Sequence, residues 1–264
     1  MTVHDNNLAI DYKLCSTCCQ CIAICTNGAL TWEGNPSREI QTELLPKSEN
    51  ILELLKARRS IRKFKNQQIN EAELQYICQV AKLAPTNVYD VELIVVTDSN
   101  LIKDLEHTAI NFIRKAISRL YSFPPVFRLL KRLTPAINEI DKVKTLNTLK
   151  RGSVFHGAPA LIMIVADPRI SHSELSCQYS LYNMALIAQT MGIGSCISGA
   201  AKTILSRNKE VNRKLSIPKH KKILGVLFLG YPNIRYIRAI EGNNAPVQWF
   251  TSDTSPNSVY PTLG

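Results

Sequence analysis

The chain has 264 residues and carries 32 Lys and Arg against 21 Asp and Glu, a formal net charge of +11. This length allows one small and one medium domain, and a hydrophobic content of 45% is ordinary for a chain that buries a core. No apolar run approaches the roughly 18–20 residues that a membrane span needs, and no nucleic-acid-binding module is visible. We therefore expect neither a transmembrane segment nor binding to nucleic acid.

A run of cysteines is the first feature along the chain. The sequence from Cys15 to Cys25 reads CSTCCQCIAIC, which gives Cys15, Cys18, Cys21 and Cys25 a C-x2-C-x2-C-x3-C spacing. That spacing is the ligand pattern of a bacterial 4Fe-4S ferredoxin segment, because thiolates at steps of three can reach separate irons of one cluster. The remaining cysteine, Cys19, interrupts the spacing and is expected to be a spare thiol. The run predicts a ferredoxin-type iron-sulfur segment over residues 1–45.

Two other uses of these cysteines are weaker. A zinc ribbon separates its two C-x2-C knuckles by a dozen or more residues, whereas two residues separate Cys18 from Cys21. A disulfide framework requires an oxidising compartment, but the N-terminus has no basic start or apolar stretch typical of a signal peptide. The sequence thus favours iron over zinc or inert thiols, and a cytoplasmic location. Only one run is present, so the fourth ligand, Cys25 or a residue from elsewhere, and the nuclearity stay open.

The part that follows reads as a larger α+β domain. Residues 34–49 are polar and contain Pro and Gly, as linkers do, and we expect the second domain to span residues 46–264. Apolar residues recur at helical spacing after Ser48 or Asn50, either of which could cap that helix. Further helices are predicted over 71–83 and 174–191, and strands over 91–97, 160–166, 194–198 and 224–229. Cys78 and Cys177 fall in apolar helical patterns and are expected to be structural.

The middle of the chain is strongly basic. Residues 111–151 contain ten Lys or Arg and two acidic residues. We expect a solvated helical excursion that covers the active site. A docking face for an acidic electron donor, such as a ferredoxin or flavodoxin, is the functional alternative. The mixture of aromatic, aliphatic and basic residues over 112–133 would also suit a membrane surface, although two prolines interrupt it.

A second basic cluster has a different character. The sequence KARRSIRKF from Lys56 brings Arg58, Arg59, Ser60 and Arg62 close together at the predicted end of a helix. Guanidinium groups bind phosphate through two parallel hydrogen bonds, and a serine hydroxyl adds a donor and an acceptor. The segment therefore suits a phosphorylated cofactor, with a solvated basic patch as the alternative.

The order of these motifs is more specific than any of them alone. The cysteine run, the linker, RRSIRKF, a helix, Ala-Pro-Thr, a strand and the late GIGSCISG together resemble the ferredoxin-fused nitroreductase family. The strings HGAPALI from His156 and LGYP from Leu229 also look like segments of that family. The resemblance covers residues 14–249.

This resemblance implies an FMN-dependent nitroreductase-like fold preceded by a small ferredoxin-like segment. It also implies an intertwined homodimer with FMN at the subunit interface. Arg58, Arg59 and Ser60 match the contacts to the FMN phosphate and ribityl chain, and Arg62 matches a basic residue near the flavin N1/O2 edge. The other matching positions are Asn87 beside the isoalloxazine, Ser198 and Gly199 near flavin N5, and Arg238, after which the family often carries phosphate-binding residues.

Two departures from the family pattern bear on FMN affinity. The loop from Pro85 is shorter by two residues and lacks the usual Gln-Pro, and Gly242, Asn243 and Asn244 stand where the family often has Arg and Lys. The late Gly192 and Gly194 would equally serve a helix end followed by a strand.

We predict an oxidoreductase that passes electrons from the cluster to FMN and on to a small acceptor, such as a nitroaromatic or a quinone. No protein nucleophile is required, and the sequence identifies no proton donor. The alternative is a non-catalytic redox sensor or interaction protein with a degenerate flavin site.

Overall fold

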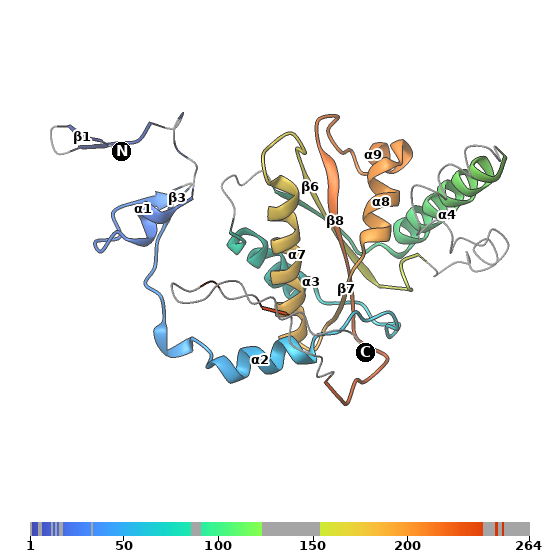
Figure 1. Ribbon diagram of the computed structural model, residues 1–264, viewed down its shortest axis with the longest axis horizontal. Helices are drawn as coiled ribbons and strands as arrows, with labels where there is room; N and C mark the ends of the chain where they lie inside the picture. Colours follow the sequence, from blue (N-terminus) through green and yellow to red (C-terminus); the bar gives the residue numbers. More distant parts are fainter. Residues whose placement is uncertain are drawn as a thin grey trace.

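The fold is a four-stranded sheet with helices on both faces (Figure 1). The computed structural model describes residues 2–4, 7–11, 13, 15, 18–32, 34–85, 91–122, 154–239, 246–247 and 250. The strands are β5 (Glu92–Val96), β6 (Ala160–Ala166), β7 (Gly194–Ile197) and β8 (Lys222–Gly230). They lie in the order β5-β6-β8-β7, and every neighbouring pair is antiparallel.

The central strand β6 is buried along its whole length, because helices cover both of its faces. Side chains alternate between the faces of a strand, so Ile162 and Ile164 enter one core and Leu161 and Met163 enter the other. The continuous apolar run in the sequence therefore predicts this strand well.

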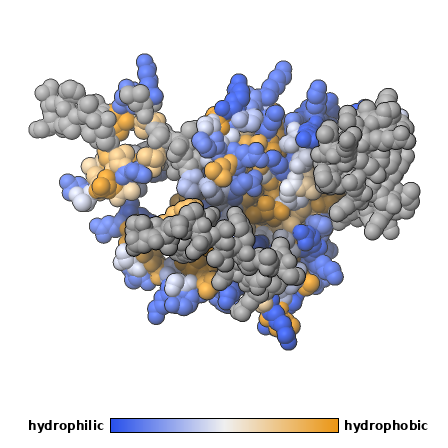
Figure 2. All heavy atoms as spheres, in the orientation of Figure 1, coloured by the Kyte–Doolittle hydropathy of each residue, from blue (hydrophilic) through white to orange (hydrophobic). Residues whose placement is uncertain are grey.

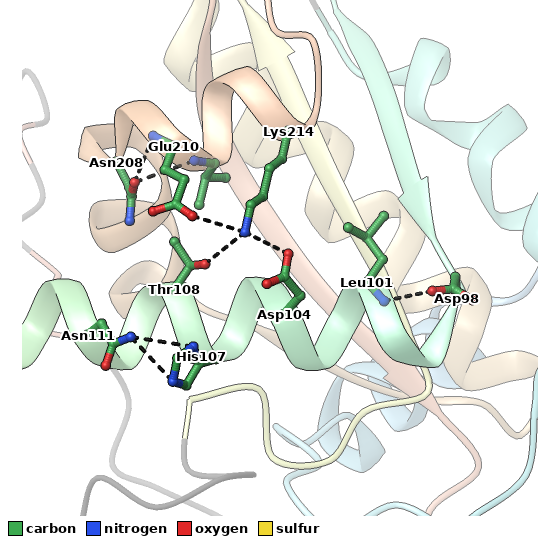
Figure 3. Close-up of polar contacts among 10 residues, drawn as sticks. Asp98, Leu101, Asp104, His107, Thr108, Asn111, Asn208, Glu210 and Lys214 are labelled. Carbon is green, nitrogen blue, oxygen red and sulfur yellow. Dashed lines mark hydrogen bonds and ion pairs between the residues drawn. The ribbon is translucent and has the colours of Figure 1, made fainter.

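Two groups of helices cover the sheet. On one face lie α3 (Glu71–Gln79), its continuation η2 (Val80–Leu83) and α7 (Ser173–Thr190); on the other lie α4 (Ser99–Ser122), α8 (Gly199–Arg207) and α9 (Lys209–Lys214). The Lys214 ammonium joins α9 to α4, at 2.7 Å from Asp104 Oδ2 and 3.3 Å from Thr108 Oγ1 (Figure 3). Within α9 it also contacts Glu210 Oε1 at 3.1 Å.

The expected strands are all present, with ends that differ by one or two residues. The helix predicted over 71–83 changes to a 3-10 turn at Val80, and its first turn has a capping box in which Asn70 and Glu73 hold each other's backbone N–H groups. The predicted cap of the preceding helix is wrong. Helix α2 (Ser48–Ala57) already includes Ser48 and Asn50, and its N-cap is Lys47, whose side chain forms no capping hydrogen bond.

The N-terminal part stands apart from the sheet in Figure 1. It contains the hairpins β1 (Thr2–His4) with β2 (Asn7–Ala9) and β3 (Thr31–Trp32) with β4 (Asn35–Pro36). Between the hairpins lies the short helix α1 (Gln20–Ala23), and η1 (Thr42–Leu44) precedes α2. Orange hydrophobic residues gather over the α1 and β3 region in Figure 2, where Ile24 is 81% exposed.

The basic middle of the chain begins within α4, which extends to Ser122, and residues 123–153 lie outside the described part. Among the helices that the structure describes, none combines the length and the apolar character needed to cross a membrane.

Candidate functional site

The basic segment after α2 is built onto the edge of the sheet. Ser60 forms a parallel bridge with Ser195 of β7, and the Ile61 N–H donates to the Ser195 carbonyl at 2.8 Å. Gly194 makes this close approach possible, since a Cβ there would lie 2.8 Å from Ile61 Cγ1. The backbone from Arg58 to Ile61 is thus held beside β7, which gives its basic side chains a fixed origin.

Arg58 has a buried donor that lacks an acceptor. Its Nε is buried and has no hydrogen-bond partner among the described residues. Its guanidinium lies 5.9 Å from the centre of the Tyr182 ring on α7, a cation–π distance. Leaving a buried donor unpaired typically costs about 1–3 kcal/mol, so an acceptor supplied by a ligand would stabilise this arrangement.

The thiol of Cys196 shows where three of the predicted residues converge. Cys196 is buried on β7, and burial raises the pKa of its thiol. Three neighbouring residues oppose that rise of the pKa. They act through the charge of Arg62, through hydrogen bonds from Ser60 and Arg62, and through the charge of Arg58. Arg58, Ser60 and Arg62 thus all act on one thiol at the edge of the sheet.

His156 is a neighbour of this cluster that the sequence analysis did not select. Its ring packs edge-on against Phe228 at 6.0 Å, and Phe228 is paired across the strands with Cys196. Burial lowers the pKa of His156, and the charge of Arg62 lowers it further, while Glu106 opposes both effects. The only sequence signal was the HGAP string, which by itself carries no chemistry.

The buried carboxylate of Glu106 positions the segment that carries His156. Glu106 Oε1 accepts hydrogen bonds from the backbone N–H groups of Val154 at 3.1 Å and Phe155 at 2.9 Å. The next residue, His156, adopts a left-handed backbone with φ of 56°. The backbone that carries the imidazole is thus anchored on its N-terminal side and held in a sparsely populated conformation.

A pocket of about 310 Å³ brings two further predicted residues together. Arg59 and Arg238 both line it, and the Arg59 Nη1 is held by the carbonyls of Lys56 and Arg58, each at 2.8 Å. The complete lining is Glu53, Lys56, Ala57, Arg59, Ile61, Gln189, Pro232, Ile234, Arg235, Tyr236, Ile237, Arg238 and Ala239. Four basic side chains against one acidic one make this pocket suitable for an anionic group.

The late glycine-rich segment supplies a helix N-terminus. The Ser198 hydroxyl accepts from the Ala201 N–H at 3.1 Å and caps α8, whose first residue is Gly199. The N–H groups of this first turn and the helix dipole favour a negative or hydrogen-bond-accepting group there. Gly192 serves as a helix end, because it follows the last turn of α7 with a φ of 73°. Asn87 lies outside the described residues.

Within the described residues, the cysteine run shows no metal-binding group. All eight cysteines are described and none is in a disulfide; Cys15 and Cys18 are exposed, while Cys19, Cys21 and Cys25 are half-buried. No group of three or more His, Cys, Asp or Glu within the described part of the chain is placed to hold a metal ion. The Ala29 N–H donates to Cys25 Sγ at 3.3 Å and, with weaker contributions from neighbouring amides, lowers the pKa of this thiol against the effect of desolvation.

Comparison with known proteins identifies the larger domain. The sequence profile of the nitroreductase family matches residues 55–231, about two thirds of the chain. The chain belongs to the nitroreductase family. A protein of Archaeoglobus fulgidus named "Putative NADH dehydrogenase/NAD(P)H nitroreductase" is 26% identical over 191 residues, which cover 70% of this chain and 86% of that protein.

Solved nitroreductases share the fold. A nitroreductase with bound FMN from Desulfitobacterium hafniense is 22% identical with a TM-score of 0.56, covering 72% of this chain and 93% of its own. An FMN-dependent nitroreductase from Clostridium difficile is 21% identical with a TM-score of 0.55, covering 77% of this chain and all of its own. These comparisons confirm the nitroreductase-like α+β fold and the prediction of a nitroreductase-like oxidoreductase. The match of the family profile begins within α2, so it does not include the cysteine run.

Proposed function

We propose that this protein is an FMN-dependent oxidoreductase that reduces a small acceptor, such as a nitroaromatic or a quinone. The observation that carries the proposal is the buried, unpartnered Nε of Arg58 in a basic segment held at the edge of the sheet. FMN has the anionic phosphate that such a segment would bind. Solved nitroreductases of the same fold contain FMN.

Different residues of the chain would bind different parts of FMN. Arg58, Arg59 and Ser60 would hold the phosphate and ribityl chain, together with Arg238, which lines the same pocket as Arg59. Arg62 would place its charge near the N1/O2 edge of the flavin. The first turn of α8, at Ser198 and Gly199, would present its N–H groups to the ring near N5.

These residues would hold FMN, which when bound would supply two-electron redox chemistry for reduction of the acceptor. The residues of this chain bind and orient it, and Asn87 belongs to the proposed set by family resemblance alone. The name of the Archaeoglobus relative includes NAD(P)H, which makes a nicotinamide one candidate donor. An acidic ferredoxin or flavodoxin is the other candidate, because the chain is basic overall.

The FMN proposal predicts that Arg58→Ala weakens FMN binding by about ten- to a hundredfold, because one charge-assisted contact is lost. Quenching of flavin fluorescence during titration of the apoprotein measures the affinity. Arg207→Ala is the matched control, since Arg207 lies exposed at the end of α8, and it should bind FMN like the wild type. Equal affinities for all three proteins would remove the assignment. Absence of binding by the wild type would favour the redox-sensor alternative.

We further propose that the N-terminal segment, residues 1–45, forms a separate unit that holds a 4Fe-4S cluster through Cys15, Cys18, Cys21 and Cys25. Two observations support this: the ferredoxin-type spacing and the amide groups that lower the pKa of Cys25. A lowered thiol pKa favours the thiolate, which is the form that binds metal. Binding of the cluster would organise this segment, as metal binding does in other small domains. Such a cluster, when bound, would relay electrons to the flavin domain.

We also propose that the protein works as a homodimer that shares its FMN sites between subunits. The support is the family resemblance together with a row of exposed apolar residues on α2, beside the pocket lined by Arg59.

A further inference from the structure

The ring of Tyr182 on α7 contacts a residue of the basic segment that follows α2. The guanidinium carbon of Arg58 lies 5.9 Å from the centre of this ring, within the roughly 6 Å over which an aromatic ring attracts a cation. Arg58 directly follows α2, and α2 packs against α7 (Figure 1). The contact therefore joins the end of one helix to the side of another.

Tyr182 is not part of the hydrophobic core. Its neighbour Leu181 is fully buried, whereas Tyr182 is 38% exposed and belongs to neither of the two clusters that cover the sheet. Tyr179, about one turn earlier, is exposed to a similar extent, at 42%, but its ring contacts no cation among the described residues. The core therefore does not require a ring at position 182, and the described partner of that ring is Arg58.

The side of α7 that carries Tyr182 is also the side that borders the pocket lined by Arg59. Gln189 of α7 lines that pocket. It follows Tyr182 by seven residues, which is about two helical turns, so both side chains leave the helix on the same side. Tyr182 thus lies about 10 Å along the helix from a residue of the pocket wall, on the side where the basic segment passes.

Arg58 has few other interactions that could hold its side chain. Its Nε is buried without a hydrogen-bond partner, and no ion pair formed within the described part of the chain includes Arg58. Burying an unpaired donor is unfavourable, so another interaction must hold the side chain there. Arg59 is held differently, because the carbonyls of Lys56 and Arg58 accept from its Nη1. A carboxylate in place of Tyr182 would neutralise Arg58, whereas a ring leaves its charge available to an anion.

We propose that Tyr182 is a positioning residue for the FMN phosphate and acts through Arg58. Its ring holds the guanidinium in place with the charge unpaired, and the terminal Nη groups of Arg58 would bind the phosphate. Because the arginine is ordered before the cofactor arrives, binding does not have to immobilise it. The arrangement favours FMN over riboflavin, which has no phosphate. This inference rests on the proposed binding of FMN and adds to it the residue that prepares Arg58.

The test compares two flavins on the full-length apoprotein, by quenching of flavin fluorescence during titration. Tyr182→Leu should weaken FMN binding by about three- to tenfold, because the cation loses its ring. The same variant should leave the affinity for riboflavin unchanged, since that flavin makes no phosphate contact. Tyr182→Phe keeps the ring and should bind FMN within about twofold of the wild type. An equal loss of FMN and riboflavin affinity in Tyr182→Leu, or an FMN affinity that Tyr182→Phe fails to restore, would overturn the proposal.

Two further variants separate this role from a general effect of the α7 surface. Tyr179→Leu is the matched control, because it removes a similarly exposed ring from the same helix, and it should bind FMN like the wild type. In an Arg58→Ala background, Tyr182→Leu should cause no further loss, because its effect passes through Arg58. An additional loss there, or an equal loss in Tyr179→Leu, would overturn the role of Tyr182. If Arg58→Ala weakens FMN binding and Tyr182→Leu does not, this inference falls while the FMN proposal stands. Absence of FMN binding by the wild type would overturn both.

Discussion

His156 gives the folded state a pH dependence at the scale of a single side chain. Its pKa is lowered from the ordinary value of 6.5 by burial and then by the charge of Arg62. In the unfolded chain the imidazole regains its ordinary pKa, so below that value the unfolded state binds more protons than the folded state. The contribution of His156 to the free energy of unfolding should therefore be full above about pH 7. It should decrease as the pH falls through 6.5 toward the lowered pKa.

His156→Gln should flatten this dependence, because glutamine cannot take up the proton. Urea unfolding at several pH values between 5 and 8 would measure the difference. His107→Gln, on the exposed side of α4, is the control and should keep the slope of the wild type. A slope that is identical in wild type and His156→Gln would contradict the assigned role of His156 in this dependence.

At the scale of an element, helix α2 leaves its apolar face exposed. An amphipathic helix is stabilised mainly by packing that face. None of its residues is buried, and Ile51, Leu52 and Leu55 are 44%, 53% and 38% exposed. Just before it, Leu44 and Leu45 are 71% and 63% exposed. The proposed homodimer would cover this face with the second subunit, as obligate dimers do with their large apolar interfaces.

Leu52→Glu is expected to weaken the dimer by at least about tenfold, because a charge would be desolvated in the interface. Analytical ultracentrifugation across micromolar concentrations measures the change. Leu83→Glu, at an exposed leucine of η2, is the control and should leave the dimer intact. A wild type that sediments as a monomer and still binds FMN tightly would refute the shared site.

At the scale of the whole molecule, the proposed relay of electrons from the N-terminal segment to the flavin domain requires an iron-sulfur cluster. Protein purified without oxygen should contain about four irons per chain, because three or four thiolates at this spacing form a cubane site. Cys18→Ala should abolish the iron, whereas Cys19→Ala should retain it. Iron analysis and the visible absorption spectrum give the result. Stoichiometric zinc in place of iron would rule out the electron relay.

The sequence by itself determined which segments fold and roughly where they end. Strand β6 follows from its apolar run, because a strand buried on both faces needs no polar residue, and α7 follows from its apolar pattern and the glycine that ends it. The sequence also located the basic segment, through side chains whose chemistry suits phosphate. The predicted N-cap of α2 was wrong. Ser48 is a suitable capping residue, but the helix already begins there and its N-cap is Lys47.

Only the tertiary structure decided which distant residues meet. Arg59 and Arg238 line one pocket, and Arg62 lies near His156, because the folded sheet and the bridge from Ser60 to β7 bring together segments that are far apart in the sequence. His156 could not be selected from the sequence, since its burial is a property of the packed chain. Local sequence fixes backbone preference and side-chain chemistry. The environment that turns a side chain into part of a site arises when the sheet and its two layers of helices close around it.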